Sequence, residues 1–139
     1  MNEPTNVKTV QHLYQAFGHE DIPSLLSLLS DNVEWFVAGP REIIPFAGKR
    51  QGRAEVAQFY SIVAESVDVL TFEPHELIAQ GDKVIALGHE RARAKATQGI
   101  YETDWAHIWT IRSGKIERLY EFFDTAAIAS AFGRPPEAH

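Results

Sequence analysis

The hydrophobic period of this chain changes near its midpoint, and that change limits the fold more than any other feature. In the first half, apolar residues recur at the spacing of one helix face, as in Val7, Val10, Tyr14 and Phe17. From Val67 onward, apolar residues alternate with polar ones, which is typical of half-buried strands. Helices followed by an antiparallel meander predict an α+β fold and not a doubly wound one.

Turn and cap signals divide the helical half. Gly18 ends the first predicted helix, and Asp21 is placed to cap a second, short, leucine-rich one. A short strand over residues 33–37 and an ordered loop over 38–52 follow, since this loop is rich in glycine and proline. A third helix is predicted over residues 53–66.

Glycine-containing turns divide the second half into strands of approximate ranges 67–79, 83–96, 101–112 and 115–124. Asp124 or Thr125 is a candidate cap for a last short helix over residues 126–132. The chain has no internal repeat, linker or low-complexity segment. We therefore predict one domain over residues 1–139.

The turn at Ser113-Gly114 decides which residues share a face of the last hairpin. A three-residue loop pairs Trp109 with Glu117 and His107 with Leu119. One face then holds Trp105, His107, Trp109, Leu119, Glu121 and Phe123. The other holds Ala106, Ile108, Thr110, Ile116, Arg118, Tyr120 and Phe122. Both faces are largely apolar, so we expect helices to cover one and a second subunit the other. A two-residue loop would shift the pairing by one and divide the first set.

Two registers are open for the strand over residues 83–96. A two-residue turn at 98–99 places Glu90 opposite His107, whereas a three-residue turn starting at Thr97 places His89 there. We favour the first register. It turns a face of small residues toward a ligand and keeps three cations of the strand out of the interior.

The inward face gathers side chains that suit proton transfer. His107 is a candidate general acid, general base or hydrogen-bond donor to an oxyanion. Burial of Glu121 would raise its pKa toward neutrality, and Glu90 would orient the imidazole. The candidate ligand-contacting residues are Trp35, Tyr14, Phe59, Trp105, Trp109, Leu119 and Phe123. A purely structural role in the core is the alternative for each residue.

Composition excludes several classes of function. The chain has 13 Lys and Arg against 19 Asp and Glu, a net charge of −6, which argues against nucleic-acid binding. It has no cysteine, which excludes disulfides and thiolate chemistry. Phosphate-binding loops, dinucleotide fingerprints and metal-ligand spacings are absent, so we expect no cofactor and no metal. No stretch reaches 18 apolar residues, and we expect a cytoplasmic protein without a membrane segment.

Several segments together resemble a known family: Leu13 to Phe17, Asp31 to Trp35, Pro45 to Gly48, Gly52 to Val56, and Asp104 to Trp109 continuing through Ser113 to Asp124. In these segments the chain resembles the SnoaL-like and ketosteroid-isomerase-like group of the nuclear transport factor 2-like superfamily. The resemblance implies a cone-shaped, curved antiparallel sheet closed by three helices. It also implies an internal pocket and frequent dimers that pack through the sheet.

The resemblance also implies roles for individual residues. His107 looks like the position where ketosteroid isomerases carry the protonated Asp of their oxyanion hole. Their general base would fall near Phe36 and their oxyanion tyrosine close to Leu13, so this match is partial. Glu121 looks like a catalytic carboxylate of limonene epoxide hydrolases. Either Glu121 or His107 suits the acid/base role of SnoaL-type cyclases.

These observations predict a small dimeric protein with an internal pocket for a largely apolar, oxygen-bearing molecule. The leading function is cofactor-free proton transfer, such as isomerisation, cyclisation or dehydration, by His107, Glu121 and Glu90. One alternative is a ligand-binding protein of the same fold that catalyses nothing. Another is a homodimeric interaction module that uses the outer sheet face at Ile108, Tyr120 and Phe122.

Overall fold

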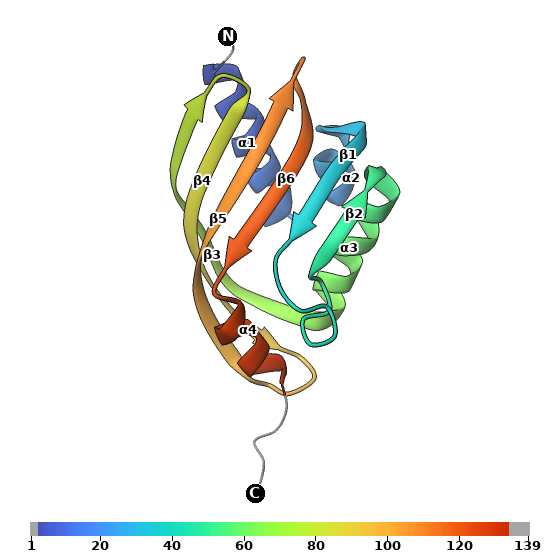
Figure 1. Ribbon diagram of the computed structural model, residues 1–139, viewed down its shortest axis with the longest axis vertical. Helices are drawn as coiled ribbons and strands as arrows, with labels where there is room; N and C mark the ends of the chain where they lie inside the picture. The colour runs from blue at the N-terminus through green and yellow to red at the C-terminus, as the bar shows by residue number, and fades with distance from the viewer. Residues whose placement is uncertain (1–2, 134–139) are drawn as a thin grey trace, which may run out of the picture.

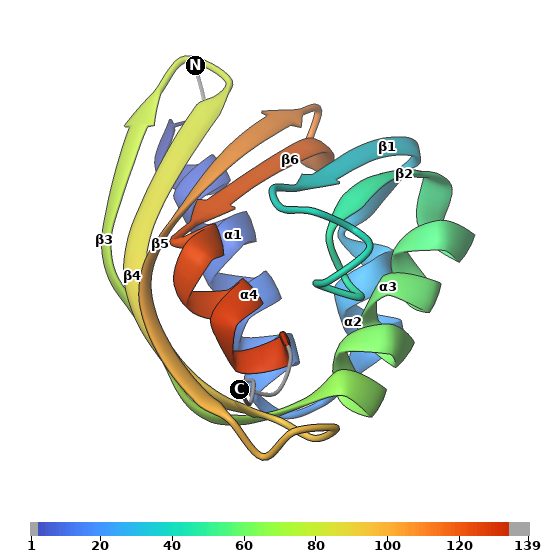
Figure 2. The ribbon, with the colours of Figure 1, turned by 60° about the horizontal axis from the view of Figure 1, so that its bottom comes forward.

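In the computed structural model, which describes residues 3–133, one strongly curved six-stranded sheet wraps around the helices (Figures 1 and 2). The helices are α1 (Glu3–Gly18), α2 (Ile22–Ser27), α3 (Gly52–Ser66) and α4 (Thr125–Phe132). The strands are β1 (Leu29–Val37), β2 (Gly48–Gln51), β3 (Val67–Gln80), β4 (Lys83–Ala94), β5 (Ile100–Arg112) and β6 (Lys115–Phe123). Their order in the sheet is β2-β1-β6-β5-β4-β3. The predicted α+β class is confirmed.

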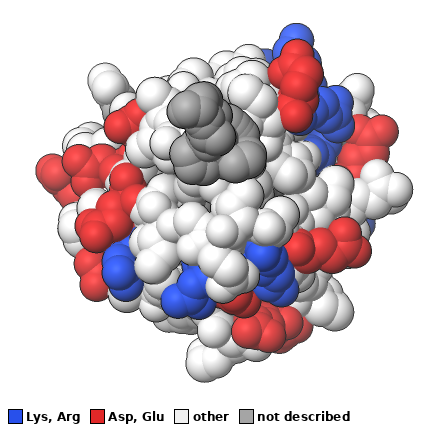
Figure 3. All heavy atoms as spheres, turned by 90° about the horizontal axis from the view of Figure 1, so that it is seen from below, with Lys and Arg blue, Asp and Glu red and all other residues white. Residues whose placement is uncertain are grey.

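The core lies between the concave face of the sheet and the helices, which Figure 2 shows inside the curve. The apolar stripe of α1 is buried at Val10 and Leu13, and that of α3 at Val56 and Phe59. Figure 3 shows the end of the molecule that holds α4, where charged side chains gather around the periphery and mainly uncharged residues lie between them. Within residues 3–133, no helix has the length and apolar character needed to cross a membrane.

The predicted helix signals are confirmed where they can be checked. Asp21 Oδ1 accepts a hydrogen bond from the Ser24 N–H at the start of α2, over 3.2 Å. Asp124, not Thr125, caps α4 by accepting from the Ala127 N–H over 3.0 Å. Each bond satisfies a donor that the first helical turn leaves without a partner.

The first part of the sheet differs from the prediction in two ways. Residues 38–52 are not all loop, because Gly48–Gln51 forms β2 and pairs antiparallel with β1. This strand is too short and too polar to show an apolar alternation. The sheet is also not wholly antiparallel, because β1 pairs parallel with β6. β1 and β6 are joined through α3 and four further strands, and so long a connection allows a parallel pair.

The hairpin of β5 and β6 has a different turn from the predicted one. Ser113 and Gly114 both have positive φ, 52° and 77°, so a two-residue turn pairs Arg112 with Lys115. The register then shifts once more between Thr110 and Ile111, where Glu117 is the extra residue of a bulge.

Two shifts of one residue restore the original division of faces. His107 therefore lies opposite Glu121, and Trp109 opposite Leu119, instead of the predicted pairs. Ile116, on the turn side of the bulge, points inward and is fully buried, so its predicted place on the outer face is wrong. The remaining inward set is retained.

Both predicted registers of β4 against β5 are wrong. Ala94 N–H donates to Gly99 O over 2.8 Å, so the connection is longer than either predicted turn. As a result Ala86 lies opposite His107, and Glu90 lies opposite Thr103. The shift is an even number of residues from the favoured register, which leaves Glu90 on the inward face as predicted.

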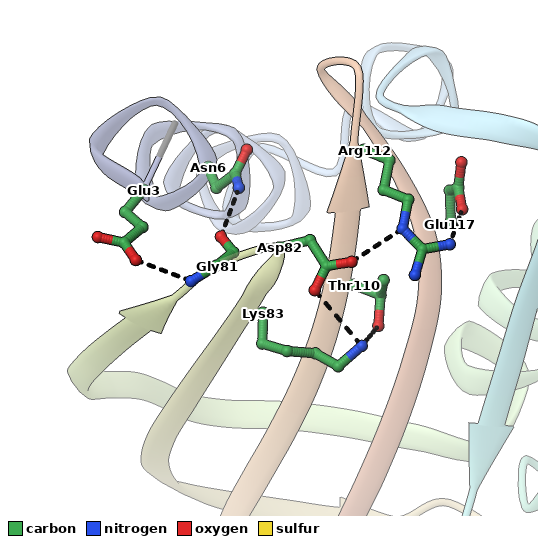
Figure 4. Close-up of polar contacts among 8 residues, drawn as sticks. All are labelled: Glu3, Asn6, Gly81, Asp82, Lys83, Thr110, Arg112 and Glu117. Carbon is green, nitrogen blue, oxygen red and sulfur yellow. Dashed lines mark hydrogen bonds and ion pairs between the residues drawn. The ribbon is translucent and has the colours of Figure 1, made fainter. Parts of the chain in front are cut away.

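Hydrogen bonds join the β3–β4 turn to the N-terminus of α1 (Figure 4). The Glu3 carboxylate accepts from the Gly81 N–H over 2.7 Å, and the Asn6 amide donates to Gly81 O over 3.4 Å. In the next turn, Arg112 Nε donates to Asp82 over 2.8 Å. The bonds of Glu3 and Asn6 connect the N-terminus of α1 to the β3–β4 turn and so fix the position of α1 along the sheet, while the Arg112–Asp82 bond ties the end of β5 to the same turn.

Candidate functional site

A cavity with a volume of about 70 Å³ lies between α1, α3 and the concave face of the sheet. Most of its lining is aromatic or aliphatic. Its polar lining residues are Tyr14, Tyr60, Glu90, Tyr101, His107 and Glu121. A mostly apolar cavity with a few polar groups that converge on it is the usual form of a small-molecule site.

His107, in the middle of β5, is held by a hydrogen-bond chain that begins in the same strand and passes through α1. Trp109 Nε1 donates to the Tyr14 hydroxyl over 3.1 Å, and this hydroxyl lies 2.7 Å from His107 Nδ1. Burial raises the pKa of Tyr14, and the charge of Glu121 adds to this effect, so the hydroxyl keeps its proton. We therefore assign Tyr14 as donor to Nδ1, which places the proton of a neutral His107 ring on Nε2.

The other ring nitrogen of His107 meets Glu121. His107 Nε2 lies 3.1 Å from Glu121 Oε2, and both side chains are nearly buried, with exposed fractions of 7% and 12%. The N–H direction does not point at this oxygen, and Nε2 has no hydrogen-bond partner within residues 3–133. A buried donor without a partner is costly, so a further polar group beside Nε2 would be stabilised there.

Aromatic stacking fixes the plane of the imidazole. The Trp105 ring lies 4.1 Å from the His107 ring at an interplanar angle of 20°, and the Phe72 ring stacks on Trp105 at 4.8 Å. Gly88 lies opposite Trp105 in β4, and a Cβ there would come within 2.2 Å of the indole. The absence of a side chain at Gly88 is therefore what allows Trp105 to lie behind His107.

Glu90 has a different environment from the predicted one. It does not face His107 across the sheet, and no hydrogen bond joins the two among the described residues. Tyr14 and Trp105 orient the imidazole instead. Burial, and next the charge of Glu121, raise the pKa of Glu90 to about 8, against smaller opposing effects of His89 and a hydrogen bond with Tyr101. Glu90 is therefore mainly protonated at neutral pH and able to donate a proton.

The predicted ligand-contacting residues divide into two groups. Those that line the cavity are Trp35, Tyr14, Phe59, Trp109 and Leu119. Trp105 does not line it, because its ring packs behind His107, and Phe123 packs against Phe46 with ring centroids 6.4 Å apart.

The lining residues that sequence reasoning did not predict are Leu13, Phe17, Phe46, Tyr60, Val63, Val67, Phe72 and Tyr101. Tyr101 continues the odd-numbered alternation of Trp105 and His107 to the start of β5, and that signal could have identified it. Phe46 lies in the loop before β2, where no periodicity applies. Within the described part of the chain, no group of three His, Cys, Asp or Glu side chains could hold a metal ion.

A curved sheet that encloses a cavity against helices defines a class, the nuclear transport factor 2-like proteins with a cystatin-like fold. A structure of an NTF2-like protein from Burkholderia xenovorans covers 96% of this chain and 99% of its own, with 32% identity and a TM-score of 0.88. A Xanthomonas campestris protein described as having a cystatin-like fold shares this architecture at 20% identity and a TM-score of 0.79, with coverage of 93% and 98%. Within the class, the SnoaL-like domain family matches residues 10–119, and the chain belongs to this family.

Two further relatives extend over nearly the whole chain. An uncharacterised protein of Mycobacterium tuberculosis is 26% identical over 134 residues, which are 95% of this chain and 98% of that protein. TerC, in a structure co-crystallised with polyporic acid, is 27% identical with a TM-score of 0.83 and coverage of 94% and 99%.

Proposed function

We propose that this protein binds a small, largely apolar, oxygen-bearing molecule in its cavity and catalyses cofactor-free proton transfer on it. The observation that carries the proposal is the buried His107 Nε2, which has no hydrogen-bond partner within residues 3–133 and lies 3.1 Å from the Glu121 carboxylate. A donor and an acceptor at this spacing can act on the oxygen and the adjacent carbon of one ligand.

In this proposal His107 and Glu121 have separate roles. Glu121 removes a proton from a carbon next to a carbonyl group, while His107 Nε2–H donates a hydrogen bond to the oxygen as it gains negative charge. Return of the proton from Glu121 to a different carbon completes an isomerisation. For a dehydration, protonated Glu90 gives its proton to the departing hydroxyl, and exchange with solvent restores both carboxyl groups.

Two observations support ligand binding and the choice of base. TerC was co-crystallised with an organic acid, polyporic acid, and its chain has this fold. Phe36, near the position expected for the base of ketosteroid isomerases, packs against Tyr120 with ring centroids 5.9 Å apart and does not line the cavity. Glu121 is therefore the base that we propose.

The proposal is tested by a thermal-shift panel of small hydroxy-ketones, small alcohols and small epoxides. Wild type is compared with His107→Ala and with His12→Ala, which removes an exposed histidine of α1. We expect a ligand that raises the melting temperature of wild type and His12→Ala, and raises that of His107→Ala much less. Equal shifts in all three proteins, or no shift in any, would contradict the proposal.

The outer sheet face supports a proposal about assembly. Cross-strand pairing places Ile78, Ile85, Ile108, Tyr120 and Phe36 in one row across five strands. Ile78 and Ile85 are 46% and 37% exposed, and the neighbouring Phe122 is 43% exposed. An apolar face of this extent is typical of an interface, and we propose that a second copy covers it. A monomer mass in sedimentation equilibrium at micromolar concentration would contradict this.

A further inference from the structure

The carboxyl groups that line the cavity have no lysine or arginine beside them in the described lining. Glu90 and Glu121 both face it, and its lining within residues 3–133 includes no lysine and no arginine. The buried Arg50 lies over the Phe59 ring, 5.1 Å from its centroid, and donates to Phe46 O, and it does not line the cavity. His107, whose Nδ1 accepts from Tyr14, brings a hydrogen-bond donor on Nε2.

The remaining lining is rich in aromatic rings. Nine of the lining residues are Phe, Tyr or Trp, and they come from α1, α3, the loop before β2 and three strands. Trp109 contacts both Trp35 and Tyr14, with ring centroids 5.8 Å apart for Trp35 and Trp109 and 6.1 Å for Tyr14 and Trp109. The faces of such rings attract cations, most strongly where water is excluded.

We propose that the ligand of this cavity carries a positive charge, as an organic ammonium ion held between Glu90 and Glu121 and surrounded by aromatic rings. This inference rests on the proposed function, because it names the substrate class of the same cavity. Together with the His107 donor, it predicts an amine that also bears a hydroxyl or carbonyl oxygen. The Glu121 carboxylate, which no lysine or arginine of the described lining offsets, disfavours an anionic ligand.

Charge coupling between the two carboxyl groups favours the same ligand. The charge of Glu121 is one of the causes that raise the pKa of Glu90 to about 8, after burial. An ammonium ion between them would favour the ionised form of Glu90. Its proton would then leave to solvent, so that one cation enters for each proton released. Glu90 could then no longer act as an acid, so an amine substrate fits the isomerisation and not the dehydration.

The size of the cavity selects the probe. An apolar cavity of about 150 Å³ holds benzene, so 70 Å³ suits a smaller molecule. tert-Butylammonium, tert-butanol and trimethylacetate share one branched apolar body and differ in charge, which makes them a matched series. Weak binding is expected of molecules this small. It is measured from the indole N–H signals of the three tryptophans in NMR titrations at pH 7.

We expect tert-butylammonium to bind at least tenfold more tightly than tert-butanol, and trimethylacetate not to bind. Glu90→Gln and Glu121→Gln each reduce ammonium binding several-fold. Glu102→Gln, which changes an exposed carboxylate of β5, leaves it unchanged. Calorimetry in buffers of different ionisation enthalpy shows proton release in wild type that is lost in Glu90→Gln.

Equal binding of the ammonium ion and the alcohol, tighter binding of the carboxylate, or no binding of the ammonium ion would overturn the inference. The proposed function fails separately. Suppose that binding of a neutral carbonyl compound depends on His107, while the ammonium ion, the alcohol and the carboxylate bind with equal affinity. The cation inference is then wrong and the proton-transfer proposal stands. If the ammonium ion binds but no ligand depends on His107, the proton-transfer proposal is wrong.

Discussion

Glu90→Gln is expected to stabilise the protein at pH 8 by up to about 5 kcal/mol, while it changes little at pH 4.5. The folded state raises the pKa of Glu90 from 4.5 to about 8, because the carboxyl group is buried and lies near Glu121. Between these two pH values the unfolded chain has lost the proton and the folded chain has kept it. The contribution of Glu90 is therefore fully present below the unfolded pKa and is lost as pH rises through the folded pKa.

This prediction is checked by urea unfolding of wild type and Glu90→Gln at several pH values between 4.5 and 8.5. The difference between the two free energies of unfolding isolates Glu90 from other titrating groups. Glutamine has nearly the same volume and retains a partner for the Tyr101 hydroxyl. Glu102→Gln is the control, since its side chain is 58% exposed. A difference that stays constant across this range would show that Glu90 ionises as freely in the folded state as in the unfolded one.

His107→Ala is expected to lower kcat/KM by 10²–10⁴-fold for the substrate that the panel identifies, the usual range for loss of a general acid or an oxyanion donor. The imidazole is the proposed donor to the reacting oxygen, and its Nε2 lies beside the proposed base, Glu121. Tyr14→Phe removes the hydroxyl contact to Nδ1 but leaves the ring, so a smaller loss is expected.

The kinetic comparison needs a control for folding, because His107 also stacks on Trp105. Unfolding free energies of all variants are therefore measured alongside the rates. His12→Ala should retain wild-type turnover. Unchanged turnover in a folded His107→Ala protein would rule out the proposed mechanism, whereas a fall in rate without a matching loss of stability would support it.

The inward-facing residues could be predicted from the sequence, although their partners could not. A side chain's face depends only on whether a register is shifted by an odd or an even number of residues. In the β5–β6 hairpin, the two-residue turn and the bulge at Glu117 each shift the register by one residue from the predicted pairing. The total shift is even, so His107 and Glu121 stay on one face. The β4 register moved by four, which keeps Glu90 inside. Nothing in the sequence around Glu117 identifies it as the extra residue of a bulge.

Contacts between distant segments were beyond sequence reasoning. Tyr14 and His107 are 93 residues apart, and their 2.7 Å contact depends on how α1 lies along the sheet. The helical periodicity of α1 identified Tyr14 as an apolar-face residue but not as a hydrogen-bond partner. The parallel pairing of β1 with β6 could likewise not be predicted from the sequence, because the alternation along a strand does not indicate the direction of the neighbouring strand.

The central claim is that His107 presents a proton on Nε2 to Glu121 and the cavity. Long-range nitrogen–proton NMR of the histidine rings tests it directly, with His107 assigned by comparison with a His107→Gln protein. In the neutral ring we expect the proton on Nε2 and a hydrogen-bonded, unprotonated Nδ1, and we expect Tyr14→Phe to weaken this preference. A proton on Nδ1 in wild type would contradict the account, since His107 would then offer the cavity an acceptor and not a donor.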